Sequence, residues 1–353
     1  MNERLLFLYK SEDGVQGYLE TLHSVYSRIV DETSRQIYQY RLLMTFTGDI
    51  KYIRKSVLAT EVGKGFQDFL AIQNKIYLYG AGIRGQRIVK MFPEMHWEGY
   101  IDRQKEGTCN GLEIVNPEQF TLKDGEIILI TNLEGYDEIK ESLVSYGINK
   151  DAIYTLNEFE VKAHQNQYFE ERCIKCFSEK QGGFIDAGSF DGGDCIKFSK
   201  STLNHNNSMY AFEPDKENYN NCKRILGNFN NMEIFNIGLS NVSQQVYFLS
   251  DRGECSRIAE QGNSMVNIDT IDSVMGEKRI GFIKMDIEGN EKEAIIGARR
   301  HIEKDKPNMM ISVYHKLEDV IEIPKLLLEM NPDYRFALGH YSVCNADTVL
   351  YAF

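Results

Sequence analysis

The fold of this 353-residue chain is constrained most by two glycine-rich turns. Each turn lies between an apolar strand-like run and a helix-like segment. The glycines are Gly80, Gly82 and Gly85 in the first turn, and Gly188 and Gly192 in the second. After each turn, strand-like runs alternate with segments of helical period, which is typical of parallel βαβ units. The sequence therefore predicts two α/β halves, each built on a mainly parallel sheet.

The same patterns predict four segments along the chain. Residues 1–74 have helical periodicity, and Asp31 stands where a helix cap is expected. Residues 75–156 predict a small Rossmann-like domain of the nucleotide-binding type, and residues 157–182 a polar linker helix. Residues 183–353 form the second α/β domain. Its predicted strands are residues 184–187, 208–213, 233–238, 245–249, 281–286, 308–314, 334–338 and 348–353.

Composition excludes several classes of function. The 40 Lys and Arg against 52 Asp and Glu leave a net charge of −12, which disfavours binding to nucleic acid or to an anionic membrane surface. The first ten residues carry too short an apolar run for a signal peptide, and no apolar stretch is long enough to span a bilayer. The seven cysteines are odd in number and scattered, which predicts reduced thiols in a cytoplasmic protein.

The second glycine turn predicts a site for an adenosine cofactor. Gly188 lets the backbone approach a ligand closely, and the helix that follows offers free N–H groups. Glu213 ends the next strand, 25 residues after Gly188, where a carboxylate can accept hydrogen bonds from two ribose hydroxyls. A plain surface loop with an incidental glutamate is the alternative.

A third block, residues 283–291, places charged side chains at the end of an apolar strand. Lys284, Asp286 and Glu288 alternate along it, so the strand period of two predicts that they share one face. Charges on one face of a buried strand are costly unless they are paired or functional. A structural Lys–Asp ion pair would explain Lys284 and only one of the two carboxylates.

These motifs resemble the FkbM-type methyltransferases in order and spacing over about residues 165–353. The resemblance rests on Asp186-x-Gly188-Ser-x-x-Gly192, Phe212-Glu-Pro214, Thr270-Ile-Asp272 and Lys284-Met-Asp-Ile-Glu-Gly-Asn-Glu291. It implies a class I Rossmann-like fold with an antiparallel last strand, which binds S-adenosylmethionine and methylates oxygen. The sequence departs from the family at Ser189-Phe190-Asp191 and at Gly339, which precedes His340.

The resemblance also implies roles for single residues. The turn with Asp186, Gly188, Ser189 and Gly192 would lie against the methionine and ribose of the cofactor, and Glu213 would bind the ribose hydroxyls. Residues Gly238 to Ser240 would edge the adenine. Asp286, which would also contact the cofactor, and Glu288 would lie at the reaction centre.

Methyl transfer to a hydroxyl needs a group that takes the proton, and the candidates are Asp286, Glu288 and His315. His315 follows a predicted strand and has an ordinary pKa near neutrality, although a structural hydrogen-bonding role is as compatible with its position. His340 is a weaker candidate. No His, Asp or Glu cluster has the spacing of metal ligands, and Cys173 and Cys176 lack a second pair, so we expect no metal.

The first glycine turn is a G-x-G-x-x-G between a strand and a helix, with Asp102 ending the next strand. This context predicts a second nucleotide site at Gly80, Gly82, Gly85 and Asp102. The segment resembles small Rossmann-like domains attached to bacterial sugar-modifying enzymes. No Tyr-x-x-x-Lys of a sugar epimerase follows, so a structural or acceptor-positioning role is an equal alternative.

Together with the motifs, the resemblance implies a bacterial, cytoplasmic O-methyltransferase that uses S-adenosylmethionine. Its expected acceptor is a sugar hydroxyl of a glycan, or of a nucleotide- or lipid-linked sugar in polysaccharide biosynthesis. The alternatives are a nucleotide-sugar oxidoreductase that uses the first glycine turn, and a protein that senses nucleotides without chemistry. Assembly into a homo-oligomer is compatible with either reading.

Overall fold

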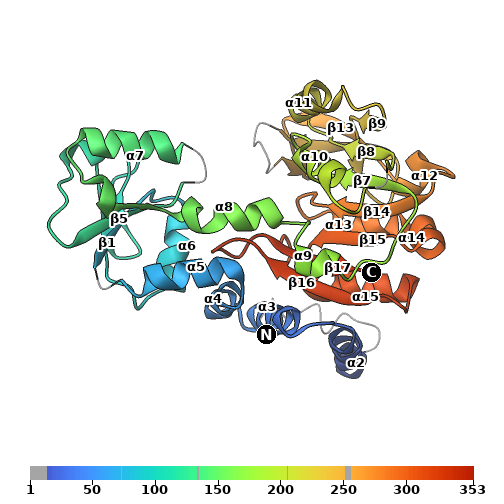
Figure 1. Ribbon diagram of the computed structural model, residues 1–353, viewed down its shortest axis with the longest axis horizontal. Coiled ribbons are helices and arrows are strands. Elements are labelled where there is room, and N and C mark those ends of the chain that lie inside the picture. Colours follow the sequence, from blue (N-terminus) through green and yellow to red (C-terminus); the bar gives the residue numbers. More distant parts are fainter. Residues whose placement is uncertain (1–13, 73, 133–134, 205, 251–255) are drawn as a thin grey trace. The chain divides into compact units, whose positions relative to one another are not determined.

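The computed structural model describes residues 14–72, 74–132, 135–204, 206–250 and 256–353 (Figure 1). The chain divides into two compact units. The large unit comprises residues 1–38, 167–339 and 347–353, and the small unit residues 39–166 and 340–346. The first ten residues and Cys255, both used in the sequence interpretation, lie outside the described residues. No helix of the described residues is long and apolar enough to cross a membrane.

A seven-stranded sheet forms the centre of the large unit, in the order β16-β17-β15-β14-β7-β8-β9. The strands are β7 Gly183–Ala187, β8 Met209–Phe212, β9 Met232–Phe235, β14 Ile280–Met285, β15 Asn308–Ser312, β16 Phe336–His340 and β17 Thr348–Ala352. β7, β8, β9, β14 and β15 pair in parallel, whereas β17 runs antiparallel to β15. This confirms the predicted class I sheet with an antiparallel late strand.

The point where the strand order reverses lies between β7 and β14. β7 connects along the chain to β8 on one side of it, and β14 pairs with β7 on the other. In open α/β sheets, ligands bind at such a switch point, beyond the carboxyl ends of the strands. Every residue of β7, β8, β14 and β15 is buried, which explains their nearly continuous apolar sequences.

Helices and a small second sheet complete the large unit (Figure 1). The helices are α2 Gly14–Ser27, α3 Glu32–Thr47, which continues into the small unit, α9 Glu171–Ile174, α10 Gly193–Lys200, α11 Lys216–Leu226, α12 Ile271–Met275, α13 Glu291–Ile296, α14 Arg299–Asp305 and α15 Asp319–Met330. The small sheet has the order β10-β13-β11-β12, with β10 Gly238–Leu239, β11 Gln244–Leu249, β12 Arg257–Ile258 and β13 Ser264–Asp269. Asp31 caps α3 as predicted, because its Oδ1 accepts from the backbone N–H of Ser34 at 3.0 Å.

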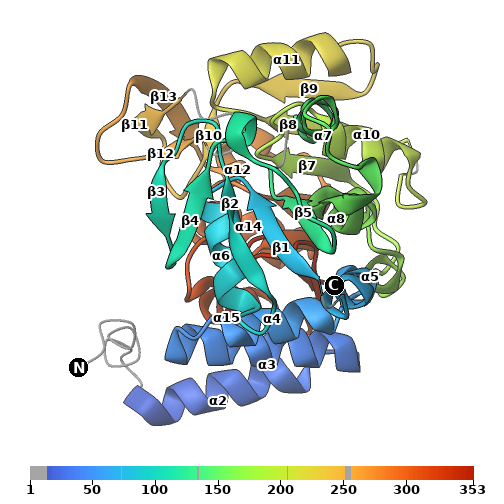
Figure 2. The ribbon, with the colours of Figure 1, turned by 90° about the vertical axis from the view of Figure 1, so that its left-hand side faces the viewer.

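The small unit has a six-stranded sheet in the order β3-β4-β2-β1-β5-β6 (Figure 2). Its strands are β1 Lys75–Tyr79, β2 Trp97–Ile101, β3 Gly107–Cys109, β4 Leu112–Val115, β5 Glu126–Ile130 and β6 Ile153–Thr155. All pairs are parallel except β3 with β4. The helices are α4 Lys51–Leu58, α5 Glu61–Leu70, α6 Ile83–Met91, α7 Tyr136–Ser145 and α8 Leu156–Asn166.

The segment between the two sheets differs from the single linker helix predicted for residues 157–182. α8 ends at Asn166 and α9 begins at Glu171, and Tyr168 between them has a left-handed backbone with a φ of 66°. A left-handed residue ends an α-helix, since it cannot continue the right-handed hydrogen-bonding pattern. The break places the Tyr168 side chain, which is buried, in the core of the large unit.

Candidate active site

A pocket of the large unit lies beyond the carboxyl ends of its central strands. It has an empty volume of about 560 Å³, which includes the solvent at its mouth. Five of the residues singled out in the sequence line it: Gly188, Glu213, Gly238, Asp286 and Glu288. Further lining residues are Phe190, Phe212, Pro214, Asn218, Ile237, Leu239, Phe248, Ser256, Arg257, Ile258, Ile287 and Asn290. The pocket thus combines apolar walls with a few polar groups, as small-molecule sites do.

Gly188 is required by the close approach of two strands. Its φ is +79°, and a Cβ atom at this position would lie 1.8 Å from the backbone oxygen of Asp286. No side chain fits there, because real Cβ atoms do not approach backbone atoms so closely. The glycine therefore lets the turn after β7 pack directly on the end of β14, which brings Gly188 and Asp286 to the same pocket wall.

Glu213 lies at the end of β8 with its carboxylate held by two backbone groups. Its Oε2 accepts from the N–H of Phe190, and its Oε1 from the N–H of Asp215, both at 2.9 Å. Each oxygen keeps one free acceptor position, so two more donors can be bound. Burial raises the pKa of Glu213 to about 7, although these two hydrogen bonds oppose the shift.

Lys284 joins the turn to the core through a buried ion-pair network. Its Nζ lies 3.1 Å from Asp186, 3.3 Å from Asp194 and 2.8 Å from the carbonyl oxygen of Gly188. Burial favours the neutral amine, but the charges of Asp186 and Asp194 outweigh it and raise the pKa of Lys284. The structural ion pair weighed in the sequence interpretation thus exists, with Asp186 and Asp194 as the partners.

Asp186 is not among the residues that line the pocket. Its side chain is fully buried, pairs with Lys284 and accepts from the thiol of Cys195 at 3.3 Å. Because Asp186 belongs to β7, its side chain is directed by the pleat of the strand, whereas the residues after the strand turn toward the ligand side. Its contribution to a cofactor site is to position the turn through Lys284.

Three other predicted cofactor residues shape the backbone and do not line the pocket. The hydroxyl of Ser189 donates to the carbonyl oxygen of Asp186 and accepts from the N–H of Phe212. Gly192 precedes α10 with a φ of 81°. Ser240 is buried, and its N–H donates to the carbonyl oxygen of Asp269.

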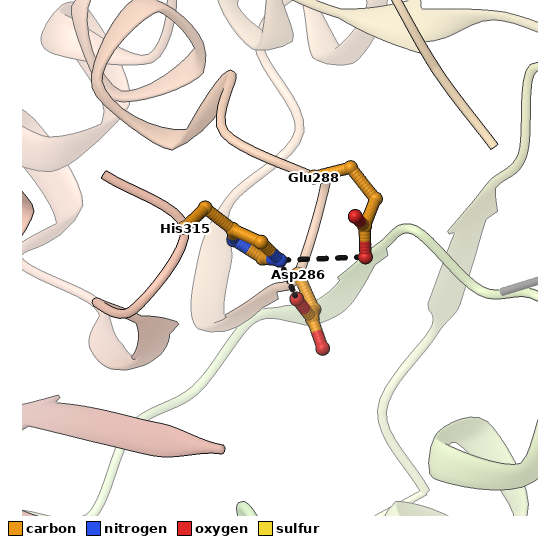
Figure 3. A group of neighbouring side chains, drawn as sticks. All are labelled: Asp286, Glu288 and His315. Atoms are coloured by element: carbon orange, nitrogen blue, oxygen red, sulfur yellow. Dashed lines mark ion pairs between the residues drawn. The ribbon is translucent and has the colours of Figure 1, made fainter. Parts of the chain in front are cut away.

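Asp286, Glu288 and His315 form a cluster at the carboxyl ends of β14 and β15 (Figure 3). The Nε2 of His315 lies 3.5 Å from Asp286 Oδ1 and 3.3 Å from Glu288 Oε1, while its Nδ1 lies 3.0 Å from Glu291 Oε1. β14 ends at Met285, and Glu288 has a left-handed backbone with a φ of 56°. The alternation predicted for residues 284–288 therefore stops at the strand end, and Lys284 points elsewhere.

The cluster shifts the ionisation of its members. Burial raises the pKa of Asp286 to about 6, against the opposing charges of His315 and Lys284. Burial favours the neutral ring of His315, but Glu288, Glu291 and Asp286 together raise its pKa to about 11. At neutral pH the imidazole therefore carries a proton, which balances part of the negative charge of the cluster.

Tyr168 and Ser312 belong to this centre and were missed in the sequence. The hydroxyl of Tyr168 donates to Asp286 Oδ2 at 2.6 Å and lies 2.9 Å from the hydroxyl of Ser312. Tyr314 also reaches Asp286, with its hydroxyl 3.4 Å from Oδ1. Tyr168 lies more than a hundred residues from Asp286 in a polar segment, so no local spacing could relate the two.

The first glycine turn has the predicted setting, between β1 and α6, but its acidic residue is already engaged. Asp102 Oδ2 accepts from the N–H of Ala81 at 2.9 Å, and Oδ1 accepts from the N–H groups of Gln104 and Lys105. Lys105 Nζ in turn donates to the carbonyl oxygen of Ala81. Asp102 therefore helps to close its own turn, and it keeps one free acceptor position where Glu213 keeps two.

Sequence families match both units. Residues 186–336 match the model of the methyltransferase FkbM domain, and residues 72–154 match that of the C2185-like N-terminal domain. The first match confirms the resemblance drawn from the motifs of the second glycine turn and the residues 284–291. No functionally curated protein matches the chain at a significant level.

Among solved structures, the chain is similar to methyltransferase FkbM from Methylobacillus flagellatus KT. The identity is 18%, the alignment covers 89% of this chain and all of the other, and the TM-score is 0.49. Aeropyrum pernix fibrillarin, solved with natively bound S-adenosyl-L-methionine, is 10% identical, with 55% of this chain and 74% of that chain covered and a TM-score of 0.35.

Proposed function

We propose, from the premise that the chain carries an FkbM methyltransferase domain over residues 186–336, that it transfers a methyl group from S-adenosylmethionine to a sugar hydroxyl. The acceptor sugar would belong to a glycan, or to a nucleotide- or lipid-linked intermediate of polysaccharide synthesis. S-Adenosylmethionine is the cofactor of this methyltransferase domain. When bound, it supplies a methyl group activated by a positively charged sulfur.

The observation that carries the proposal is the pocket at the switch point of the sheet, whose lining includes the carboxylates of Glu213, Asp286 and Glu288. Glu213 has one free acceptor position on each oxygen, which suits the two ribose hydroxyls of an adenosine. Gly238 and Leu239 offer a flat apolar edge for adenine, and the nearby carboxylates favour a cationic sulfonium. The residues present therefore fit the cofactor.

The chain's own groups then align the acceptor and remove a proton. In the transfer, the bond between methyl carbon and sulfur breaks as the bond between methyl carbon and acceptor oxygen forms, and the sulfur keeps the electron pair. The hydroxyl proton passes to a carboxylate of the pocket wall, where Asp286 and Glu288 lie. Tyr168 holds Asp286 in place by its 2.6 Å hydrogen bond to Oδ2, so that Oδ1 stays oriented.

A neutral sugar hydroxyl agrees with the charge of the site. Two carboxylates face the reaction end of the pocket, and Arg257 is its only cationic lining residue within the part that the structure describes. Such a wall repels anionic acceptor groups near the reacting oxygen, while a phosphate further away can contact Arg257. The sequence resemblance of residues 75–156 to small domains attached to bacterial sugar-modifying enzymes adds to this support.

Transfer of a labelled methyl group tests the proposal. The full chain is incubated with S-adenosylmethionine carrying ¹³C in its methyl group and with a panel of nucleotide sugars and lipid-linked sugars, and the products are read by NMR. We expect an O-methyl signal on a sugar with the wild-type protein and none with Asp286→Asn. A label on nitrogen or carbon, or none with any sugar although the cofactor binds, would overturn the assignment of sugar oxygen.

The pKa of Glu213 predicts how cofactor binding depends on pH. Ribose hydroxyls donate to the ionised carboxylate, so binding must lower a pKa that burial has raised to about 7. Below pH 7 the affinity should fall by up to about tenfold per pH unit, and above it the affinity should level off. Calorimetry in buffers of different ionisation enthalpy should detect the proton released on binding near pH 6.5.

The variant Glu213→Gln is the control for this prediction. It keeps the size of the side chain and removes the titrating group, so the affinity should be lower by at least about tenfold and independent of pH between 6 and 8. A pH dependence that survives in Glu213→Gln would show that another group is responsible.

A further inference from the structure

We propose that Asp286, Glu288 and His315 bind one divalent metal ion in the wall of the pocket. Each of the three residues offers one ligand atom, and these atoms all lie within 4.8 Å of one another. The proposal that an ion binds here rests on the geometry of the three side chains alone. Its use in holding the acceptor oxygen rests on the proposed methyl transfer.

The distances between the ligand atoms suit a metal ion. The Nε2 of His315 lies 3.3 Å from Glu288 Oε1 and 3.5 Å from Asp286 Oδ1 (Figure 3). Two ligands that each lie about 2.1 Å from a tetrahedral ion are ~3.4 Å apart. Both distances from the imidazole therefore already match the spacing of two ligands of one ion.

The remaining atoms of the ligands are held by further groups, as metal ligands usually are. Tyr168 donates to Asp286 Oδ2, which leaves Oδ1 directed at His315. Glu291 Oε1 lies 3.0 Å from His315 Nδ1 and is itself fixed by the N–H of Ile287 at 2.9 Å. A carboxylate behind the imidazole orients the ring so that Nε2 faces the ion.

The burial of His315 points independently to a ligand. Its side chain is only 10% exposed, and both ring nitrogens are shielded from solvent. Among the described residues, the protonated ring is held by ion pairs with carboxylates at 3.0 to 3.5 Å and not by a hydrogen bond of good geometry. A metal ion would take the place of the proton on Nε2 and bind His315, Asp286 and Glu288 at once.

The donor set indicates the kind of ion. Imidazole favours Zn²⁺ and similar ions, and carboxylates favour Mn²⁺ and Mg²⁺, so one imidazole with two carboxylates fits Mn²⁺ or Zn²⁺. Three protein ligands leave at least one coordination position for water or for an acceptor oxygen, as in catalytic rather than structural sites. Because Asp286 and Glu288 line the pocket, this open position would face the substrate.

Direct metal binding tests the proposal without any assay of activity. The full chain, freed of metal with a chelator, is titrated with Mn²⁺ and followed by electron paramagnetic resonance, and then with Zn²⁺ in a calorimeter. We expect one ion per chain, at least about 100-fold weaker binding in Glu288→Gln and His315→Gln, and a loss of about 10- to 100-fold in Glu291→Gln. Circular dichroism checks that each variant is folded. Of the three substituted side chains, that of Glu288 is the most exposed, at 22%, so Glu288→Gln should disturb the fold least.

Asp272→Asn is the matched control. Asp272 also pairs with a histidine of the large unit, His301, at 2.6 Å, but this ion pair contains one carboxylate where the proposed metal site has two. It should leave the metal affinity unchanged. Absence of Mn²⁺ and Zn²⁺ binding at millimolar concentration, or binding that survives in both Glu288→Gln and His315→Gln, would overturn the proposal. Titration of the same samples with S-adenosylmethionine keeps the two claims apart, since cofactor binding without metal binding contradicts only the metal site.

Discussion

Replacing Asp286 by asparagine should lower kcat by about 10²- to 10⁴-fold while the Kd for S-adenosylmethionine changes by less than about tenfold. Asparagine has nearly the same size and can still accept from Tyr168, but it takes no proton and carries no charge. The loss should therefore appear in turnover rather than in cofactor binding. Single-turnover kinetics and calorimetry on the same sample measure the two quantities.

The Asp272→Asn variant again serves as the control, because Asp272 lies outside the pocket lining and should leave both quantities unchanged. Turnover of Asp286→Asn within about tenfold of the wild type would remove Asp286 from the chemistry. A large loss of cofactor affinity in this variant would instead assign it to the cofactor site.

Replacing Lys284 by methionine should lower the free energy of unfolding by about 3–5 kcal/mol. The lysine is 4% exposed, and its removal leaves the carboxylates of Asp186 and Asp194 without their shared cation in a buried place. Breaking a buried ion pair by removing one partner is costly, because the other charge stays uncompensated. Urea denaturation of the full chain measures the change, with the transition of the large unit as the readout.

Lys304→Met gives the matched comparison. Lys304 also forms an ion pair, with Glu277, but its side chain is 58% exposed, and exposed pairs stabilise a fold by at most about 1 kcal/mol. A loss in Lys284→Met as small as that in Lys304→Met would show that the network around Lys284 does not hold the turn.

Much of the large unit could be predicted because its strands are short, apolar and bounded by glycine or charged residues. The runs around Asp186, Glu213 and Asp286 each end at the carboxyl edge of the sheet, so the chemistry-bearing residues after them meet in one pocket. Strand ends in the sequence therefore pointed to Gly188, Glu213, Asp286 and Glu288, whereas Gly238 was implied only by the family resemblance. In a parallel sheet, the carboxyl ends of strands that are far apart in the sequence lie side by side. These strand ends can be recognised in the sequence, where an apolar run stops.

Contacts that depend on side-chain direction could not be predicted. Asp186 looks like a ligand-binding residue because it precedes the glycine turn, yet its side chain meets Lys284 in the core. Tyr168 owes its place to a left-handed backbone in a segment with purely helical periodicity. The cluster of Asp286, Glu288 and His315 joins two strand ends 25 or more residues apart, so its spacing does not resemble a metal motif.

Calorimetric titration with S-adenosylmethionine and with NAD(H) tests the central claim most directly. The account predicts that S-adenosylmethionine binds one site per chain, that Glu213→Gln weakens it by at least about tenfold, and that NAD(H) gives no heat of binding. Binding of NAD(H) alone, or an affinity for S-adenosylmethionine unchanged in Glu213→Gln, would contradict it.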